Sequence, residues 1–482
     1  MPRILRILLG LSALPFIAST AAAQIPTEEY AARRDSLAAR MGPGVLIAFG
    51  APGPVTYEFQ LRQLPAFNYL TGFQEPNAAM ILIHEDGEVR HTLFTERPTV
   101  RTQLYDGFRE DPETLARRTG AMVRSLEDLT GYVDSLAATG LPFFELRDFA
   151  SGDNASADSL TRGRVFVESL QARHPNLEVA DLHRDIRELR AKKSPAEVAL
   201  IREAIAITDE AHRAALGVIQ PGAWEYQVEA AIEHAFRNRG ADGPAYSSIV
   251  GSGINSTTLH YVANDRQMEA GDLVLMDIGA QVAGYAADIT RTAPVSGTFT
   301  PDQRAIYELV LAAEKAAEAQ IRPGASPERS LAAATQVRLQ GMADLGLIQS
   351  PDATYDPPWP VDCEARPDQC LQGMLFMIHG ISHGIGLEVH DPSQFSIHGE
   401  YAPGDVFTIE PGIYINFHVL EMLPDTPRNR EFVAAVGETV RRYHEIGVRI
   451  EDDYLVTEDG VERLSAAPRE AAEIEAVMDR QR

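Results

Sequence analysis

Four acidic side chains lie in or beside apolar stretches that are typical of buried strands. The segments GDLVLMD and GDVFTIE end in Asp277 and Glu410, each at the same distance after a Gly-Asp turn. A second acid follows each of them between apolar or β-prone residues, Asp288 in GYAADIT and Glu451 in GVRIEDDYLV. Two similar half-units, each supplying two acids, predict a pseudo-symmetric pair of hairpins that face one site.

Acids placed together in an interior need a source of positive charge. Without cations they would repel one another, and each would have to become protonated or leave the interior. Two divalent metal ions remove this conflict, because the ions supply the charge and the carboxylates can bridge them. For any single acid the alternative is a solvent-exposed position or a salt bridge to arginine.

Four histidines support the metal interpretation. The segment MIHGISHGIGLEVHD contains His379, His383 and His390 in a glycine-rich, apolar context, and TTLHYVAND adds His260. A lone histidine in such a context is more often a core residue, but a cluster of three favours ligands or catalytic groups. Oxygen ligands with one imidazole suit Mn²⁺, Co²⁺, Fe²⁺ or Zn²⁺ and disfavour metals that prefer thiolate.

These groups must be positioned by an α/β framework. Apolar runs at residues 45–49 and 79–84 alternate with a predicted helix over 117–138, which is an α/β pattern. Ser194-Pro195 marks the start of a long helix, with Glu197 in its first turn, so we place a domain boundary between Asp181 and Ser194.

The second part of the chain is predicted to surround short strands with helices. The amphipathic pattern predicts helices over 194–218, 225–239, 301–321 and 327–345, and a polar surface loop over 351–370. Cys363 and Cys370 fall in this loop. We expect a local disulfide, with free thiols as the alternative, because a metal site would need more ligands nearby.

The composition and the first residues of the chain indicate where the protein is located and which partners it does not bind. The formal net charge of −26 and pI of about 4.9 oppose binding to nucleic acid or anionic lipid. Residues 1–23 combine Arg3 and Arg6 with an apolar run and a small-residue end, which predicts a cleaved signal peptide. The run is shorter than the ~20 residues of a membrane span. We therefore expect an exported, periplasmic or secreted protein that does not stay in the membrane.

Five ordered motifs resemble those of one enzyme family. SSIVGSGINSTTLHY, GDLVLMDIGAQVAGYAADITRT, HGISHGIGLEVHD, TIEPGIYI and VRIEDDYLVT are similar to successive motifs of the pita-bread metallopeptidases, specifically the Xaa-Pro aminopeptidase (aminopeptidase P) and prolidase branch. Upstream, FQLRQLPAFNYLTGFQEPNAAMILI resembles the amino-terminal domain of aminopeptidase P. The resemblance implies a smaller amino-terminal α/β domain (24–185) followed by a pseudo-symmetric pita-bread catalytic domain (190–470).

The resemblance also implies the roles of individual residues. It assigns a dinuclear centre, for which we expect Mn²⁺ with Co²⁺, Zn²⁺ or Fe²⁺ as alternatives, to Asp277, Asp288, His383, Glu410 and Glu451. A metal-bridging hydroxide would attack the scissile carbonyl, and Glu410 would pass its proton toward the leaving nitrogen. His260 and His390 would hydrogen-bond the substrate, His379 would line the proline pocket, and Arg449 would orient a ligand carboxylate or the substrate.

The expected activity is hydrolysis of the amino-terminal Xaa-Pro bond of proline-containing peptides. One alternative is a prolidase restricted to dipeptides, because the stretch between Glu410 and Glu451 is long and, like the 351–370 loop, could cover the site. A second is a non-catalytic exported binding protein, which the retained ligand types disfavour. Creatinase-like hydrolysis is disfavoured for the same reason. The resemblance further implies a homodimer or homotetramer.

Overall fold

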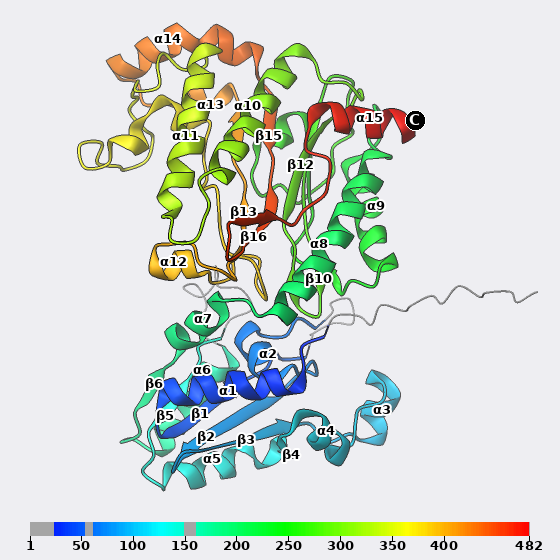
Figure 1. The fold of residues 1–482 in the computed structure, drawn as a ribbon, viewed down its shortest axis with the longest axis vertical. Coiled ribbons are helices and arrows are strands. Elements are labelled where there is room, and N and C mark those ends of the chain that lie inside the picture. Colours follow the sequence, from blue (N-terminus) through cyan, green and yellow to red (C-terminus); the bar gives the residue numbers. More distant parts are fainter. Residues whose placement is uncertain (1–23, 54–60, 149–160, 482) are drawn as a thin grey trace, which may run out of the picture.

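The chain folds into two α/β units that meet through α7 (His183–Ala191) and α8 (Pro195–Leu216). In Figure 1 the amino-terminal unit lies below and the catalytic unit above. This computed structural model describes residues 24–53, 61–148 and 161–481, so the predicted signal peptide lies outside the described residues. None of the helices in these ranges is both long and apolar enough to cross a membrane.

A six-stranded mixed sheet forms the centre of the amino-terminal unit. Its spatial order is β4-β3-β2-β1-β5-β6, with β1, β2 and β3 antiparallel and the outer neighbours parallel. The strands are β1 (Gly44–Phe49), β2 (Ala79–Glu85), β3 (Glu88–Thr95), β4 (Met122–Ser125), β5 (Phe143–Glu145) and β6 (Val179–Asp181). The two strands predicted from apolar runs are therefore central ones, which explains why both of their faces are apolar.

Helices cover both faces of this sheet. Alternate residues of β1 enter two cores, with Leu46 in one and Val45 and Ile47 in the other, as the two-residue period of a strand requires. The first core packs against α1 (Thr27–Met41), α2 (Pro65–Thr71) and α4 (Pro112–Thr119), and the second against α5 (Leu129–Ala137) and α6 (Arg162–Arg173). The first core continues into α8, which fixes the two units against each other.

The prediction of one continuous helix over residues 117–138 is wrong. Helix α4 ends at Thr119 because Gly120 takes a left-handed conformation (φ 67°), which glycine adopts readily. The chain then forms β4, which pairs in parallel with β3 at the sheet edge, before α5 begins at Leu129. A short edge strand between two helices carries little periodic signal of its own.

The predicted helices of the catalytic unit are confirmed within a few residues. Ser194 and Glu197 form a capping box at the start of α8, and Thr300 and Gln303 form another at α10. The helices are α9 (Glu225–Asn238), α10 (Pro301–Glu318), α11 (Pro327–Asp344), α12 (Gln394–His398), α13 (His418–Glu421), α14 (Pro427–Arg442) and α15 (Ala471–Gln481). They surround the short strands that carry the acids (Figure 1).

The two predicted antiparallel strand pairs are present, but two further strands lie between the partners of each pair along the chain. We call each pair a hairpin. Strand β9 (Leu273–Ile278) pairs antiparallel with β12 (Ile289–Pro294), and β13 (Val406–Ile409) pairs antiparallel with β16 (Asp452–Val456). The other strands are β7 (Gly243–Pro244), β8 (Ile249–Ser252), β10 (Ala280–Val282), β11 (Tyr285–Ala286), β14 (Gly412–Ile415), β15 (Ile446–Arg449) and β17 (Val461–Arg463).

The predicted 351–370 loop is largely irregular and ends in a short 3₁₀ turn, η4 (Pro367–Cys370). Cys363 and Cys370 form the predicted disulfide. Tyr355 is buried and packs against Phe432 of α14, with the ring centres 6.2 Å apart. The loop is therefore attached to the second insertion, between β14 and β15, which contains α13 and α14.

Helix α7 contacts both units. Arg40 of α1 pairs with Glu188 at 2.6 Å, and Arg190 pairs with Glu388 of the catalytic unit at 2.6 Å. The amino-terminal sheet ends at Asp181 and α8 begins at Pro195. The domain limits 24–185 and 190–470 stay predictions, because the helix between the units belongs to both by its contacts.

Candidate metal centre

The first hairpin supplies two acids, each almost completely buried. Asp277 lies in β9 opposite Thr290 of β12, and Asp288 directly precedes β12. Their exposed fractions are 9% and 5%. The Tyr246 hydroxyl lies 2.5 Å from an oxygen of each. Because one hydroxyl has one proton to donate, it can satisfy only one of the two carboxylates at a time.

The second hairpin supplies the other two acids. Ile409 of β13 pairs with Asp452 of β16, so Glu410 and Glu451, the next residue outward on each strand, lie at the same end of the ladder. The Thr290 hydroxyl donates to Glu451 Oε2 at 2.7 Å, and the Glu451 amide donates to the Thr290 carbonyl at 3.1 Å. Thr290 therefore joins the two hairpins and brings the four acids together.

His383 lies among these acids. Its Nε2 atom is 3.5 Å from Asp288 Oδ2, 3.5 Å from Glu410 Oε1 and 3.9 Å from Glu451 Oε1. Ligand atoms of Asp288, His383 and Glu451 lie within 4.8 Å of one another, a spacing that could hold a metal ion. The structure thus brings His383 together with three of the four acids, and Tyr246 connects the fourth, Asp277, to Asp288.

The electrostatics of this acid cluster, which we define as Asp277, Asp288, Glu410 and Glu451, favour a bound cation. Burial and the neighbouring Asp277 raise the pKa of Glu451 to about 8. Burial and the charge of Glu451 raise the pKa of Asp288 and that of Glu410 well above their usual range. Burial, followed by the nearby His390, lowers the pKa of His383 to about 4, so its imidazole is neutral at pH 7. Carboxylates that resist ionisation without a cation and a neutral imidazole fit a metal site.

Arg449 contacts the acid cluster directly. Its guanidinium pairs with Asp277 and donates to the Tyr414 hydroxyl at 2.9 Å. Tyr414 in turn lies 2.7 Å from Nε2 of His379. His379 Nδ1 is 3.5 Å from Glu410 Oε2. Arg449 therefore orients a carboxylate of the cluster, and His379 belongs to the same contact chain.

The other two candidate histidines are placed differently. The ring of His390 packs against that of His383, with centres 4.2 Å apart. His260 is exposed in the turn after η3 (Gly253–Thr257). Within the described ranges, no hydrogen bond or ion pair joins His260 to the acid cluster. The structure thus brings His390 against His383, whereas His260 lies apart, and both side chains are exposed.

Two tyrosines at the centre were not predicted. Tyr246 directly precedes the SSIVGSG motif, and Tyr414 lies within TIEPGIYI. Burial and Asp277 raise the pKa of Tyr246 well above its usual range, and burial raises that of Tyr414 to about 12. Both are therefore neutral donors at pH 7. Their closeness to the motifs was the available signal, but tyrosine in apolar sequence is usually a core residue.

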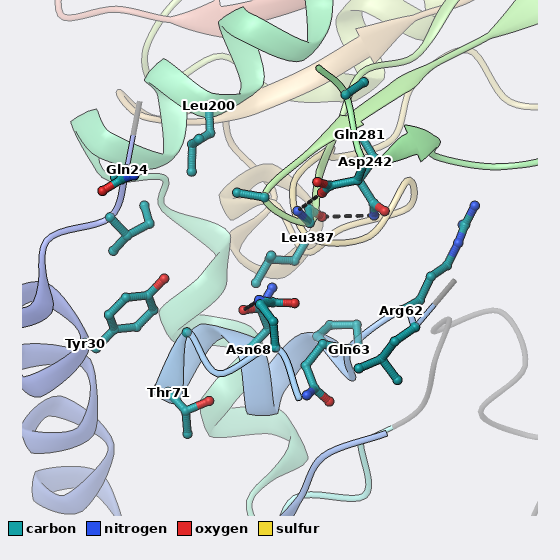
Figure 2. Close-up of a pocket in the computed structure, with 18 of the residues that line it drawn as sticks. Gln24, Tyr30, Arg62, Gln63, Asn68, Thr71, Leu200, Asp242, Gln281 and Leu387 are labelled. Atoms are coloured by element: carbon teal, nitrogen blue, oxygen red, sulfur yellow. Dashed lines mark hydrogen bonds between the residues drawn. The ribbon is translucent and has the colours of Figure 1, made fainter. Parts of the chain in front are cut away.

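A cavity of about 1160 Å³ lies away from the acids, between the two units (Figure 2). Asn68 of α2 and Leu387 of the catalytic unit both line it. On its border, Arg62 donates to the Pro244 carbonyl at 2.5 Å. None of the nine candidate site residues lines this cavity. The metal centre and the space between the units are therefore separate features.

Comparisons with known proteins agree with this geometry. The profile of metallopeptidase family M24 matches residues 199–458, and that of the aminopeptidase P amino-terminal domain matches residues 30–141. Xaa-Pro aminopeptidase of Escherichia coli is 33% identical over 470 residues, with 94% of this chain and 98% of that protein covered. Xaa-Pro dipeptidase of Homo sapiens is 30% identical over 442 residues, with 86% and 84% covered.

Solved structures give the same result. Zinc-substituted E. coli aminopeptidase P in complex with product aligns with a TM-score of 0.78 at 31% identity, covering 95% of this chain and 99% of that chain. Proline aminopeptidase P II from Yersinia pestis aligns with a TM-score of 0.78 at 33% identity, covering 94% and 100%. The M24 match alone spans more than half of this chain. The chain therefore belongs to metallopeptidase family M24, in its aminopeptidase P and prolidase branch.

Proposed function

We propose that this protein is an exported Xaa-Pro aminopeptidase that uses two divalent metal ions to hydrolyse the first peptide bond of substrates with proline in second position. The observation that carries the proposal is the placement of His383 within 3.5–3.9 Å of two buried acids, Asp288 and Glu451, and of the partly buried Glu410. Family membership gives this cluster a hydrolytic role, and the related proteins with this name align over nearly their whole length.

The metal-binding residues we propose are Asp277, Asp288, His383, Glu410 and Glu451. Their oxygen-rich set with one neutral imidazole suits Mn²⁺, with Co²⁺, Zn²⁺ or Fe²⁺ as alternatives. When bound, such ions supply the positive charge that the acids lack and lower the pKa of a water molecule so that it can attack at neutral pH. Tyr246 and Thr290 orient two of the carboxylates through hydrogen bonds.

The remaining groups act on protons and on the substrate. Glu410, whose Oε2 atom lies 3.5 Å from His379 Nδ1, would accept a proton from the attacking water and pass it to the leaving proline nitrogen. We assign His390 and His260 to hydrogen bonds with the substrate carbonyl. His260 must contact the substrate from its exposed turn. Arg449 acts through Asp277, and His379, adjacent to Tyr414, borders the proline pocket.

Selection of an Xaa-Pro bond has a physical basis. Proline has no amide hydrogen and its ring fixes φ, so sites that bind an extended strand through backbone hydrogen bonds accept it poorly. The ring instead fits a compact pocket. A free α-amino group held near carboxylates would restrict cleavage to the first bond.

Substrate length is the main alternative, because both aminopeptidases and dipeptidases occur among the relatives. The two insertions contact each other, since Asn429 of α14 donates to the Asp356 carbonyl at 2.8 Å. Together they could restrict the entrance, which would favour dipeptides. We test this by incubating the Mn²⁺-loaded protein with Arg-Pro-Pro and with Gly-Pro. Cleavage of the tripeptide is expected, and cleavage of the dipeptide alone would establish the prolidase alternative.

Self-association is supported by α3 (Val100–Asp106). Val100 and Leu104 lie one turn apart in α3 and are each 78% exposed, and Phe108, just beyond the end of the helix, is 90% exposed. Exposed apolar stripes of this kind mark protein interfaces. We propose that a second copy of the chain covers this stripe in a homodimer or homotetramer. Sedimentation of the purified protein as a single copy at micromolar concentration would refute this part of the proposal.

Export is proposed from the composition of residues 1–23 and is supported by the Cys363–Cys370 disulfide, which suits an oxidising compartment. Mass spectrometry of the protein recovered from a bacterial periplasm or culture medium should find an amino terminus near Gln24. Recovery of the intact chain from the cytoplasm alone would contradict export.

A further inference from the structure

The segment that carries His383 and His390 is a closed loop. Gly384 and Asp391 form an isolated antiparallel bridge, in which the Asp391 amide donates to the Gly384 carbonyl at 2.8 Å. This closure places the two histidines, which precede the two bridge residues, ring against ring. The relative position of the two imidazoles therefore depends on how the loop is held at Asp391.

Space inside the loop is filled by the Asp391 carboxylate. A Cβ atom on Gly386 would lie 2.6 Å from Asp391 Oδ2 and 2.8 Å from Lys193 Cε. A Cβ atom on Gly384 would lie 2.4 Å from the Asp391 carbonyl oxygen. The two glycines thus allow the loop to wrap closely around a buried charge.

Two cations from the segment between the units neutralise that charge. Arg190, near the end of α7, pairs with Asp391 and donates to Glu388 Oε2 at 2.6 Å. Lys193, just before α8, donates to Asp391 Oδ2 at 2.7 Å. The side chains of all four residues are at most 8% exposed. A buried group of two cations and two acids is costly to desolvate, so its geometry must be well satisfied.

Lys193 is fully satisfied in this position. Besides Asp391 it donates to the Pro392 carbonyl at 3.0 Å and to the Arg190 carbonyl at 2.8 Å, which accounts for all three ammonium hydrogens. Its amide also donates to the Gly404 carbonyl at 3.0 Å. Lys193 therefore links the end of the loop to α7 and to the turn that precedes β13.

The amino-terminal unit holds the other side of this segment. The Tyr69 hydroxyl of α2 donates to the carbonyl of Leu189, the residue before Arg190, at 3.1 Å. Leu387, in the middle of the 384–391 loop, borders the cavity between the units (Figure 2). The contact path thus runs from α2 through α7 to the residue that follows His390.

We propose that Arg190 and Lys193 are positioning residues that set the orientation of His390 through Asp391. The proposal rests on the proposed function for the role of His390. It assigns to the segment between the units a part in catalysis, although neither cation contacts the acid cluster. Misplacement of a catalytic group by about 1 Å can cost on the order of 100-fold in rate.

The first test compares steady-state kinetics of Lys193→Met with wild type on Arg-Pro-Pro. We expect kcat to fall at least about tenfold with KM changed less than about threefold, because His390 acts in the transition state. Lys193→Arg, which keeps the charge, should recover most of the loss. Arg202→Met, which removes an exposed partner of Glu462 from α8, the helix that follows Lys193, is the matched control and should retain wild-type kinetics.

A double-variant cycle separates positioning from general damage. If Lys193 acts through His390, the substitution Lys193→Met should lower kcat little further in a His390→Ala background. Losses that multiply in the double variant would overturn the proposal. If Lys193→Met does not fold, Arg190→Lys replaces it in the same cycle, since it keeps the charge but cannot contact both acids in the same way.

A measurement that does not depend on activity distinguishes failure of the positioning proposal from failure of the proposed function. Hydrogen exchange measured by mass spectrometry should show faster exchange in residues 384–391 of Lys193→Met, with β9 unchanged. Unchanged exchange in the loop would overturn the positioning proposal even if peptidase activity is present. Absence of activity in the wild type with the expected change in exchange would instead refute the proposed function alone.

Discussion

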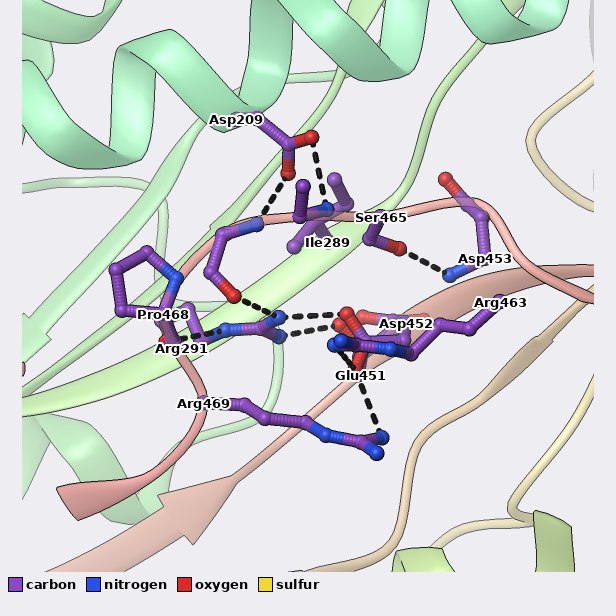
Figure 3. Close-up of polar contacts among 12 residues, drawn as sticks. Asp209, Ile289, Arg291, Glu451, Asp452, Asp453, Arg463, Ser465, Pro468 and Arg469 are labelled. Atoms are coloured by element: carbon purple, nitrogen blue, oxygen red, sulfur yellow. Dashed lines mark hydrogen bonds and ion pairs between the residues drawn. The ribbon is translucent and has the colours of Figure 1, made fainter. Parts of the chain in front are cut away.

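Two buried charge clusters lie on opposite sides of the same strands, and they are built on different principles. The acid cluster consists of four carboxylates, of which Asp277 forms an ion pair with Arg449. On the other side, Asp452 pairs with Arg291 at 2.5 Å, Arg463 at 3.2 Å and Arg469 at 3.4 Å (Figure 3). The buried Glu314 shares Arg469, at 3.5 Å. We call Asp452 and these three arginines the paired cluster.

The contrast is sharpest between the neighbours Glu451 and Asp452. Burial acts on both, yet the arginines hold the pKa of Asp452 below its usual range, whereas burial and Asp277 raise that of Glu451 to about 8. Among the described residues, no arginine or lysine forms an ion pair with Glu451. Acids that the chain itself neutralises form a structural network, and acids that it leaves without cations require a charge from outside.

The paired cluster also supports the acid cluster. Arg291 donates to the Glu451 carbonyl at 2.7 Å and to the carbonyls of Pro468 and Ala467 at 2.8 and 2.9 Å (Figure 3). Arg291 therefore fixes the backbone on which Glu451 is carried. The paired cluster thus fixes the backbone, and this backbone positions the carboxylates of the acid cluster.

The largest expected effect comes from removing an acid from the acid cluster. Asp288→Ala should lower kcat/KM by more than about 1,000-fold and reduce the bound metal measured by mass spectrometry, because it deletes an oxygen ligand. Glu462→Gln, at an exposed ion pair, is the matched control and should keep both. Equal metal-dependent turnover in Asp288→Ala and wild type would contradict the role of Asp288 as a ligand. Absence of metal-dependent turnover from the wild type would support the non-catalytic binding protein.

Removing an arginine from the paired cluster should act on stability first. Arg291→Met leaves Asp452 buried with weaker partners, and breaking a buried pair costs about 3–5 kcal/mol. Urea unfolding should show this loss, while Arg202→Met at an exposed pair should change the free energy of unfolding by less than about 1 kcal/mol. If the two variants are equally stable, the contrast between the clusters is wrong.

The smallest expected effect is the pH dependence of the metal-free protein. Carboxyls whose pKa is raised by folding bind more protons in the native state than in the unfolded state, so stability falls as pH rises from about 4.5 toward 8, the pKa values of Glu451 before and after burial. Between pH 6 and 8 the melting temperature in EDTA should drop by roughly 5 °C.

Adding Mn²⁺ in excess should remove most of this slope, because the ions favour the ionised carboxylates. A melting temperature of the EDTA-treated protein that rises over the same range would show that the acids are not crowded as the structure has them.

Much of the framework could be predicted from the sequence. The repeated Gly-Asp turn and apolar run predicted both strand pairs, and Ser194-Pro195 with Glu197 predicted where the long helix α8 begins. The helix predicted over 117–138 failed because β4 gains its stability from β3, a partner distant in the sequence. A local sequence pattern reflects only local conformational preferences, whereas an edge strand forms because it pairs with a neighbouring strand.

What the sequence alone determined is which chemical groups are present. It supplies five residues that suit a metal site, in an order that resembles one peptidase branch, and two cysteines close enough to pair. Only the tertiary structure decided which acids are neutralised by the chain and which are not. Glu451 and Asp452 are adjacent acids in a strand-rich segment, and nothing local distinguishes them. Strand alternation turns them to opposite sides, where arginines from distant segments surround one and leave the other with His383 and further acids.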